Sequence, residues 1–203
     1  TYQQLGWLQF NQRQYAEAIE AFESAVQAKK ANAAAWYGLA QAYRAKGQYA
    51  EALRAIRQTL HLREDWVEAL VAHGNLLLHE GVNGRVSAIA QFTKALLLEP
   101  QRTQTRLHLV DALQRLGRSD EAQQVLNEGL AFTPDAGDLL QAQIQLLIDT
   151  KRTQEARSLC HHLLRLQPHD GNSWLLLARV LVQRKRLRSA ERVLARAQRL
   201  ATP

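Results

Sequence analysis

The sequence has few of the residues that break helices or cross-link chains: among 203 residues there are four prolines, ten glycines and one cysteine. Scarce proline and glycine disfavour a β protein with many tight turns and favour long helices. The lone cysteine, Cys160, excludes an internal disulfide and any metal site built from several cysteines. No run of about eighteen apolar residues occurs, so the sequence predicts no membrane-spanning helix.

Methionine is absent altogether, and the sequence begins with Thr1. We therefore expect a processed chain or an excised piece of a longer protein. A basic start followed by an apolar run and a small-residue cleavage site is not visible, so no secretory signal is predicted. Because 46% of the residues are hydrophobic, we expect a folded chain and not a disordered one. The compartment stays open between the cytoplasm and a bacterial periplasm.

Charge is distributed unevenly along the chain. Residues 1–170 carry 18 basic and 18 acidic side chains, whereas residues 171–203 carry eight basic side chains and one acidic side chain. The whole formal net charge of +7 therefore belongs to the C-terminal end. This distribution disfavours a nucleic-acid-binding protein with a uniformly basic surface.

A pattern of one small residue, a bulky residue four positions later and a small residue three positions after that occurs six times. The first copy is Ala18, Phe22 and Ala25, and the copies follow at steps of 34 residues with one step of 36. The other copies are Ala52, Ile56, Thr59; Ala88, Phe92, Ala95; Ala122, Leu126, Gly129; Ala156, Cys160, Leu163; and Ala190, Leu194, Ala197. Because spacings of three and four place residues on one helical face, each copy predicts a helix.

A second pattern with helical spacing lies upstream of each copy and is clearest in Trp36, Leu39, Ala40 and Tyr43. Its other copies are Tyr2, Leu5, Gly6; Leu70, Gly74, Leu77; Arg106, Leu109, Val110, Leu113; Leu140, Ile144, Leu147; and Trp174, Leu177, Ala178, Leu181. Turn signals separate the two patterns in several copies: Lys46-Gly47-Gln48, Glu80-Gly81 and Leu116-Gly117-Arg118. Each unit is therefore predicted to be helix, short turn, helix.

These columns closely resemble the tetratricopeptide repeat family, whose unit of about 34 residues carries Trp, Leu-Gly and Tyr on its first helix and Ala, Phe, Ala and then Pro on its second. Pro100, Pro134 and Pro168 stand where the second helix should end, whereas Lys30 and Glu64 replace proline in the first two copies. The resemblance covers the whole chain. It implies one all-α domain, a right-handed α-solenoid of antiparallel helix pairs. The implied repeats span about residues 1–32, 33–66, 67–102, 103–136, 137–170 and 171–203.

Twelve helices are expected from this register. They span residues 1–12, 15–28, 34–46, 49–62, 67–80, 85–98, 103–116, 119–132, 137–150, 153–166, 171–184 and 187–200. The two extra residues of the third unit fall within 79–84 and are interpreted as a loop insertion. Gln143 and Cys160 stand at positions that are apolar or bulky in the other copies.

The resemblance also implies a concave face, lined by the first helix of each unit, that is the usual peptide-binding surface. First-helix residues that lie off the apolar stripe are the candidates for contact with a partner: Trp7, Phe10, Tyr37, Gln41, Arg44, Asn75, His108, Asp111, Gln141, Gln145 and Arg179. Trp7, Phe10 and Tyr37 are expected to form an aromatic patch. Gln41, Asn75, Gln141 and Gln145 are expected to form a polar ladder for an extended peptide backbone. The alternative is that the aromatic rings pack against a neighbouring unit.

The last predicted helix carries a basic patch. Arg188, Arg192, Arg196 and Arg199 share one face of this helix, and Arg184, Lys185 and Arg186 fill the turn before it. Such a stripe suits phosphates, anionic lipid head groups or an acidic protein. The alternative is a solvated outer face on an end repeat. Because no aromatic residues interleave the arginines, single-stranded nucleic acid is disfavoured.

The same helix carries a second, apolar edge made of Val193, Leu194, Ala197 and Leu200. In the family, a further helix usually covers this edge of the last unit. Some of these side chains should cover the first helix of their own unit. The rest of the edge is expected to meet an acidic partner, a second copy of the chain or a downstream helix; the alternative is an exposed edge small enough to be tolerated.

Residues with catalytic or metal-binding patterns are scarce. Cys160 occupies a bulky-column position and is expected to be a buried packing thiol. His79 and His108 come from neighbouring first helices, but no third ligand accompanies them. Asp111 and Asp138 lack the spacing of a paired acid–base site. The sequence therefore predicts no enzyme activity, no cofactor and no metal site.

Two hypotheses about function follow. The first is a scaffold that binds an extended segment or helix of another protein in its concave groove, as part of a larger protein or assembly complex. The second is an adaptor to an anionic surface, membrane or nucleic acid, through the C-terminal arginines, without insertion into the bilayer. Salt separates them, because the second interaction should weaken steeply as salt rises and the first only mildly.

Overall fold

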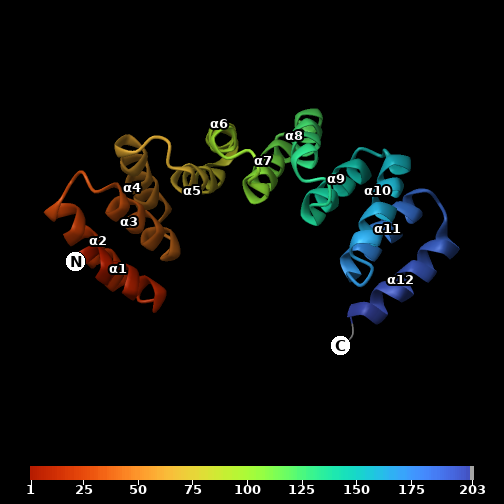
Figure 1. Ribbon diagram of the computed structural model, residues 1–203, viewed down its shortest axis with the longest axis horizontal. Helices are drawn as coiled ribbons and strands as arrows, with labels where there is room; N and C mark the ends of the chain where they lie inside the picture. Colours follow the sequence, from red (N-terminus) through yellow and green to blue (C-terminus); the bar gives the residue numbers. More distant parts are fainter. Residues whose placement is uncertain (202–203) are drawn as a thin grey trace. The chain divides into compact units, whose positions relative to one another are not determined.

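The structure is a computed structural model that describes residues 1–201. The chain forms two compact units, Thr1–Pro100 and Gln101–Pro203, which are described separately. Their helices are labelled in Figure 1. Residues 202–203, the end of the predicted sixth repeat, lie outside the described part. Within residues 1–201 the regular structure is entirely helical.

The first unit contains six α-helices and one short 3₁₀ helix. They are α1 (Tyr2–Asn11), α2 (Tyr15–Ala28), α3 (Ala33–Ala45), α4 (Tyr49–Leu62), α5 (Val67–Leu77), η1 (Leu78–Glu80) and α6 (Gly81–Leu98). Each helix packs against its neighbours in sequence, and α1 also packs against α3. Side-chain caps begin α1 and α3: Thr1 forms a capping box with Gln4, and Asn32 Oδ1 accepts from the Ala35 N–H at 3.1 Å.

The second unit repeats this order with α7 (Thr103–Arg115), α8 (Ser119–Phe132), α9 (Gly137–Asp149), α10 (Thr153–Leu166), α11 (Gly171–Gln183) and α12 (Leu187–Ala201). First helices again pack on one another, α7 on α9 and α9 on α11. All twelve predicted helices are present in the described part of the chain. Ten of them agree with the prediction to within one residue at each end.

The turn inside each helix pair contains one residue with positive φ. These residues are Arg13, Gly47, Gly81, Gly117, Lys151 and Lys185. In all but the third pair, the following N–H donates to a carbonyl five residues earlier, as Gln48 N does to Tyr43 O at 2.9 Å and Arg152 N to Leu147 O at 2.8 Å. This is the Schellman type of helix end, in which the positive-φ position favours glycine. Three of the pairs nevertheless place a basic residue there.

The third pair differs, and the expected loop insertion within 79–84 is wrong. The chain passes from α5 through η1 directly into α6, which begins at Gly81 and is 18 residues long. The extra residues therefore lengthen the N-terminal part of a helix. Gly84 makes this possible, because a Cβ at that position would overlap the carbonyl oxygen of Leu77 at the end of α5.

In the first unit, phenylalanine rings pack against glycines on the first helices. Phe22 of α2 is completely buried, and its ring occupies the space that a Cβ on Gly6 or Gly38 would need. Phe92 of α6 is equally buried and lies against Gly74 in the same way. The small column of one helix and the bulky column of the next thus fit together as the sequence pattern predicts.

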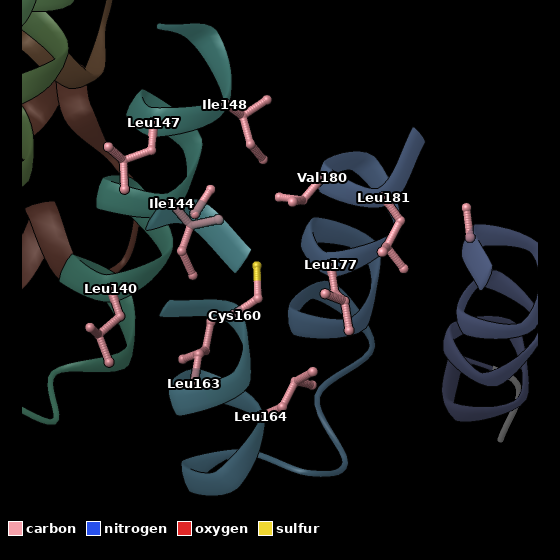
Figure 2. Packing of buried hydrophobic residues seen from close by; sticks show 12 residues of the cluster. Leu140, Ile144, Leu147, Ile148, Cys160, Leu163, Leu164, Leu177, Val180 and Leu181 are labelled. Atoms are coloured by element: carbon pink, nitrogen blue, oxygen red, sulfur yellow. The ribbon is translucent and has the colours of Figure 1, made fainter. Parts of the chain in front are cut away.

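In the second unit, the core is aliphatic. Leu126 and Cys160 occupy the position of Phe22, and both are completely buried. Figure 2 shows Cys160 reaching from α10 into the space between α9 and α11, near Ile144 and Leu177. Burial raises the pKa of the Cys160 thiol to about 12. The thiol is therefore a neutral packing group, as predicted.

Four polar residues of this unit are also buried: Thr105, Arg106, Gln143 and Ser173. Arg106 is 4% exposed, its Nη1 donates to Val125 O at 3.0 Å, and its stem fills the space that a side chain on Gly129 would need. Glu128 lies 3.8 Å from the Arg106 guanidinium. Gln143 is 9% exposed and donates to Asn127 Oδ1 at 2.8 Å. These bonds offset part of the cost of burying polar groups.

Candidate functional site

A groove lies along the first helices of the second unit, α7, α9 and α11. Its volume is about 630 Å³. The residues that line it are Gln104, Leu107, Asp138, Gln141, Ala142, Gln145, Asn172, Leu175, Leu176 and Arg179. The lining combines amide side chains, one acid and one arginine with an apolar floor in which Leu175 is 42% exposed.

Three polar side chains of the groove form hydrogen bonds, one within the lining and two to residues just outside it. An Arg179 Nη1–H donates to Gln145 Oε1 between α11 and α9, while Gln145 Nε2 donates to Asp149 Oδ1 at 2.7 Å. Gln141 Nε2 donates to Asp170 Oδ2 at 3.3 Å. A ligand that bonds these amides must therefore use their remaining N–H and C=O sites or compete with the existing hydrogen bonds.

Asp170 fixes the start of α11 beside α9. Its carboxylate accepts from the Asn172 N–H at 3.3 Å, from the Ser173 N–H at 2.9 Å and from the Ser173 hydroxyl at 2.6 Å. The same carboxylate accepts from Gln141. An N-cap bond of this kind anchors the first turn of the helix, so Asn172 and Leu175 are held at the edge of the groove.

Among the sequence-predicted residues, Gln141, Gln145 and Arg179 lie together in this groove. His108 and Asp111 lie on α7 outside its lining. Asp111 accepts from Arg115 Nε at 2.8 and 2.9 Å. His108 is half-buried, and burial lowers the pKa of its imidazole, with the charge of Asp111 acting in the opposite direction.

The three predicted aromatic residues lie in the first unit and pack against rings. Trp7 contacts Phe10 edge-on with ring centroids 5.6 Å apart, contacts the buried Phe22 at 5.2 Å and lies 6.4 Å from Tyr37. Tyr37 is closer still to Trp66, at 4.7 Å. The patch is therefore continuous with the core, and its rings are half-buried.

The remaining first-unit candidates have different surroundings. Gln41 is 9% exposed, and its Oε1 accepts from Arg44 Nε at 3.1 Å. Arg44 is exposed and Asn75 is half-buried. Of the residues predicted to form a polar ladder, Gln41 and Asn75 belong to the first unit, and Gln141 and Gln145 line the groove of the second.

Sequence reasoning did not select Gln104, Leu107, Asp138, Ala142, Asn172, Leu175 and Leu176 as groove residues. Asp138, Asn172 and Leu175 stand one to four residues after the start of their helices, where the apolar stripe gives little guidance. A register signal exists, because Asp138 and Asn172 are 34 residues apart. Asp138 and Asn172 therefore occupy equivalent repeat positions, and this equivalence predicts that both lie on the same edge of the groove.

The sequence profile described as "Tetratricopeptide repeat" matches residues 10–74, 86–144 and 147–202, which is most of the chain. The chain belongs to the tetratricopeptide repeat family. Among curated proteins, none matches it in sequence.

Solved tetratricopeptide repeat structures have the same fold. PilW, a widely conserved type IV pilus biogenesis factor, superposes with a TM-score of 0.75 at 20% identity over 97% of this chain and 90% of that chain. PilF of Pseudomonas aeruginosa gives 0.74 at 17% identity, over 97% and 86%. YrrB, a tetratricopeptide repeat protein with an unusual peptide-binding site, gives 0.68 at 18% identity, over 90% and 93%. These likenesses confirm the predicted all-α solenoid class.

The predicted basic patch of the last repeat is partly engaged within the second unit. An Arg184 Nη1–H donates to Gln154 Oε1, and the Arg196 guanidinium lies over the Trp174 ring at 4.2 Å. Arg192, Arg196 and Arg199 line a depression along α12. Lys185, Arg186 and Arg188 are exposed.

The apolar edge of the last tetratricopeptide repeat borders a second groove, of about 430 Å³. The lining residues are Ile148, Leu175, Ala178, Arg179, Val182, Gln183 and Leu194. Leu194 is 37% exposed although the equivalent Cys160 is fully buried, because in the described chain no first helix follows α12. Val193 instead packs onto the core beneath α12.

Two features are absent from the described residues 1–201, a membrane-spanning helix and a cluster of metal ligands. None of the helices there is long and apolar enough to cross a bilayer. Within residues 1–201, no three His, Cys, Asp or Glu side chains gather as metal ligands would.

Proposed function

We propose that this tetratricopeptide repeat chain is a protein-interaction scaffold, and that it binds an extended segment of a partner in the groove lined by α7, α9 and α11. The observation that carries the proposal is the lining itself: amide side chains from three consecutive first helices surround the exposed Leu175. We infer that the scaffold works as part of a larger protein or assembly complex.

The chemistry of the groove suits a peptide backbone. An extended segment offers one N–H and one C=O per residue, and an Asn or Gln side chain can both donate and accept. Asp138 and Arg179 have opposite charges, so the ligand has a preferred direction. Leu107 and Leu175 add apolar surface that side chains of the segment can contact.

The groove residues belong to the helices that line the concave face in this family. The structural neighbour YrrB is a peptide-binding protein, and PilW acts in pilus biogenesis. Both relationships support protein binding as the proposed function, at the level of the class of ligand.

A peptide-display selection against the 203-residue chain provides the test. We expect enriched peptides to lose binding when Gln141 and Asn172 are both replaced by alanine, because both side chains lie at the groove edge. Gln124→Ala on α8, an exposed amide outside the groove, is the matched control. Enriched peptides that bind the double variant and the wild type equally would refute this site. The sequence-based prediction for Tyr37 and Asn75 is tested in parallel with Tyr37→Ala/Asn75→Ala.

A second function, adaptor to an anionic surface, is favoured by one observation: three arginines line a single depression on α12. Phosphate or lipid head groups bound there would be released by salt. Binding to vesicles containing about 30% anionic lipid, at low and high ionic strength, tests it, since contacts between exposed charges are screened beyond about 8–10 Å in physiological salt. Salt-independent binding would contradict this second function.

A further inference from the structure

A separate cavity of about 490 Å³ lies in the first unit between α2, α3 and α4. Its lining residues are Glu23, Val26, Gln27, Trp36, Leu39, Tyr43, Glu51, Arg54 and Ala55. The cavity thus has an aliphatic floor, two aromatic walls and two carboxylates. None of these residues belongs to the groove proposed for the partner segment.

Both carboxylates keep acceptor capacity. Glu23 Oε1 accepts from the Tyr43 hydroxyl at 2.6 Å, and Glu51 Oε1 accepts from Arg54 Nη2 at 3.1 Å. These hydrogen bonds use one oxygen of each carboxylate, and a carboxylate pair can accept several more. Burial, followed by the hydrogen bond to Glu23 and the charges of Glu23 and Glu51, raises the pKa of Tyr43 to about 12, against the opposing charge of Arg54.

The indole that walls the cavity is held in place. Trp36 Nε1 donates to Lys30 O at 2.9 Å, and the ring packs on Ala25, Val26 and Ala35. Trp174 stands at the equivalent position of the last repeat and donates to Pro168 O, also at 2.9 Å and also six residues earlier. The two tryptophans are therefore a matched pair within one chain.

Trp174 and Trp36 differ in the residue that the repeat places over the indole ring, and Trp66 gives a second example of an arginine in that role. The Arg196 guanidinium lies 4.2 Å from the centre of the Trp174 ring, and Arg63 lies 4.9 Å from that of Trp66. By the repeat register, Gln58 stands in the second repeat where Arg196 stands in the last. The cavity beside Trp36 therefore has an indole and the carboxylates of Glu23 and Glu51, but Gln58 and not an arginine at the position equivalent to Arg196.

We propose that the cavity between α2, α3 and α4 binds an arginine side chain of a partner protein, with the guanidinium against Trp36 and paired to Glu23 and Glu51. A planar guanidinium both stacks on an aromatic face and pairs with carboxylates, whereas its methylene stem suits Val26 and Leu39. The site is independent of the groove on α7, α9 and α11 and extends the surface that a partner can contact.

Arg54 is the built-in competitor of the ligand. Its side chain is 74% exposed and pairs with Glu51 at the cavity. Removal of this guanidinium frees Glu51 and removes a like charge, so the ligand should bind more tightly. A gain of binding of this kind is specific to the proposed geometry.

The test follows the four indole N–H signals of the ¹⁵N-labelled chain during titration with the peptide acetyl-Ala-Ala-Arg-Ala-Ala-amide. The Trp36 signal, assigned with Trp36→Phe, should shift and saturate, whereas that of Trp174 should not move. The same peptide with citrulline, the neutral isostere of arginine, should bind at least about tenfold more weakly, because it loses two charge-assisted pairs.

Variants sharpen the assignment. Glu23→Gln/Glu51→Gln should weaken the arginine peptide about tenfold, and Arg54→Gln should strengthen it about threefold. Glu20→Gln on α2 and Arg57→Gln on α4, exposed residues outside the cavity, are the matched controls for charge and should leave binding within twofold. Gln141→Ala/Asn172→Ala should also leave it unchanged, which separates this site from the peptide groove.

Equal binding of the arginine and citrulline peptides would overturn the proposal. So would a Trp36 shift that survives Glu23→Gln/Glu51→Gln in a chain whose helical circular dichroism is unchanged. A peptide with lysine in place of arginine that binds equally well would overturn the assignment to a guanidinium.

Discussion

The two units fill the interfaces between their first and second helices with opposite distributions of side-chain volume. In the first, the second helices contribute phenylalanine and the first helices contribute glycine, as with Phe22 against Gly6 and Gly38. In the second, Cys160 and Leu126 stand in the phenylalanine column, while Ile144 and Val110 stand in the glycine column. The family pattern therefore constrains the sum of the volumes at each interface more than the identity of either residue.

The comparison explains residues that depart from the family pattern. Cys160 is small because Ile144 and Leu176 already fill the space between α9 and α11. Arg106 replaces an apolar residue, and Gly129 provides the room for its stem. Each departure is matched by a change on the neighbouring helix.

The largest expected effect is the difference in the free energy of unfolding between two truncations at equivalent positions, Phe22→Ala and Cys160→Ala. Phe22→Ala should cost about 3–5 kcal/mol in the free energy of unfolding, because a large buried ring leaves a cavity beside two glycines. Cys160→Ala should cost about 1–2 kcal/mol, because only one sulfur atom is removed. Urea unfolding followed by circular dichroism measures both. Equal costs would contradict the account of the two cores.

A second prediction tests the complementarity directly. Gly38→Ala should cost about 1–3 kcal/mol, because the new methyl group overlaps the Phe22 ring. Phe22→Leu introduced into Gly38→Ala should recover part of that loss, and a double-mutant cycle from urea unfolding gives the coupling. If the changes in the free energy of unfolding are strictly additive, the side chains at positions 22 and 38 do not compete for the same space.

A third prediction concerns one half-buried histidine in each unit, His73 and His108. Burial lowers the pKa of His73, against the opposing effect of Gln91, and it lowers that of His108. A folded-state pKa below the unfolded value of about 6.5 means that the unfolded state binds protons first, so stability is lost as pH falls below that value. Thermal unfolding of His73→Gln/His108→Gln should show a flatter pH dependence between about pH 6.5 and pH 5. A pH dependence equal to that of the wild type would contradict these shifts.

The smallest expected effect lies in the turns. Lys151 and Lys185 of the second unit have φ of 62° and 58°, at the position that Gly47 fills in the first. Lys151→Gly should stabilise the chain by about 0.5 kcal/mol, because relief of a strain of about 1 kcal/mol is partly offset by the flexibility of glycine. Chemical denaturation compares Lys151→Gly with Lys46→Gly. Lys46 precedes Gly47, the positive-φ residue of its turn, so its replacement by glycine should destabilise the chain.

Much of the fold follows from the sequence because its pattern repeats. The two repeating patterns, which contain Ala18 and Trp36, predict the positions of all twelve helices. Spacings of three and four residues indicate a helix, and the step of about 34 residues fixes where the next one falls. The start of α6 was missed because it depends on the approach of Gly84 to Leu77, a contact between backbones that periodicity does not encode.

The candidate site is less predictable than the fold. The register identifies the first-helix face, and so finds Gln141, Gln145 and Arg179. It does not reveal that Arg179 and Gln145 are bonded to each other, because such pairing depends on side-chain rotamers across two helices. Nor does it show that Gln41 is buried, which depends on how neighbouring helices rotate against each other.

The most direct test of the central claim is the dissociation constant of a display-selected peptide, measured by fluorescence anisotropy on three forms of the chain. If the groove on α7, α9 and α11 holds the segment, Gln141→Ala/Asn172→Ala should raise the dissociation constant by about tenfold or more, since two hydrogen bonds of about 0.5–1.5 kcal/mol are lost. Gln124→Ala should leave it unchanged. A double variant that binds as tightly as the wild type, with its helices intact, would contradict the claim.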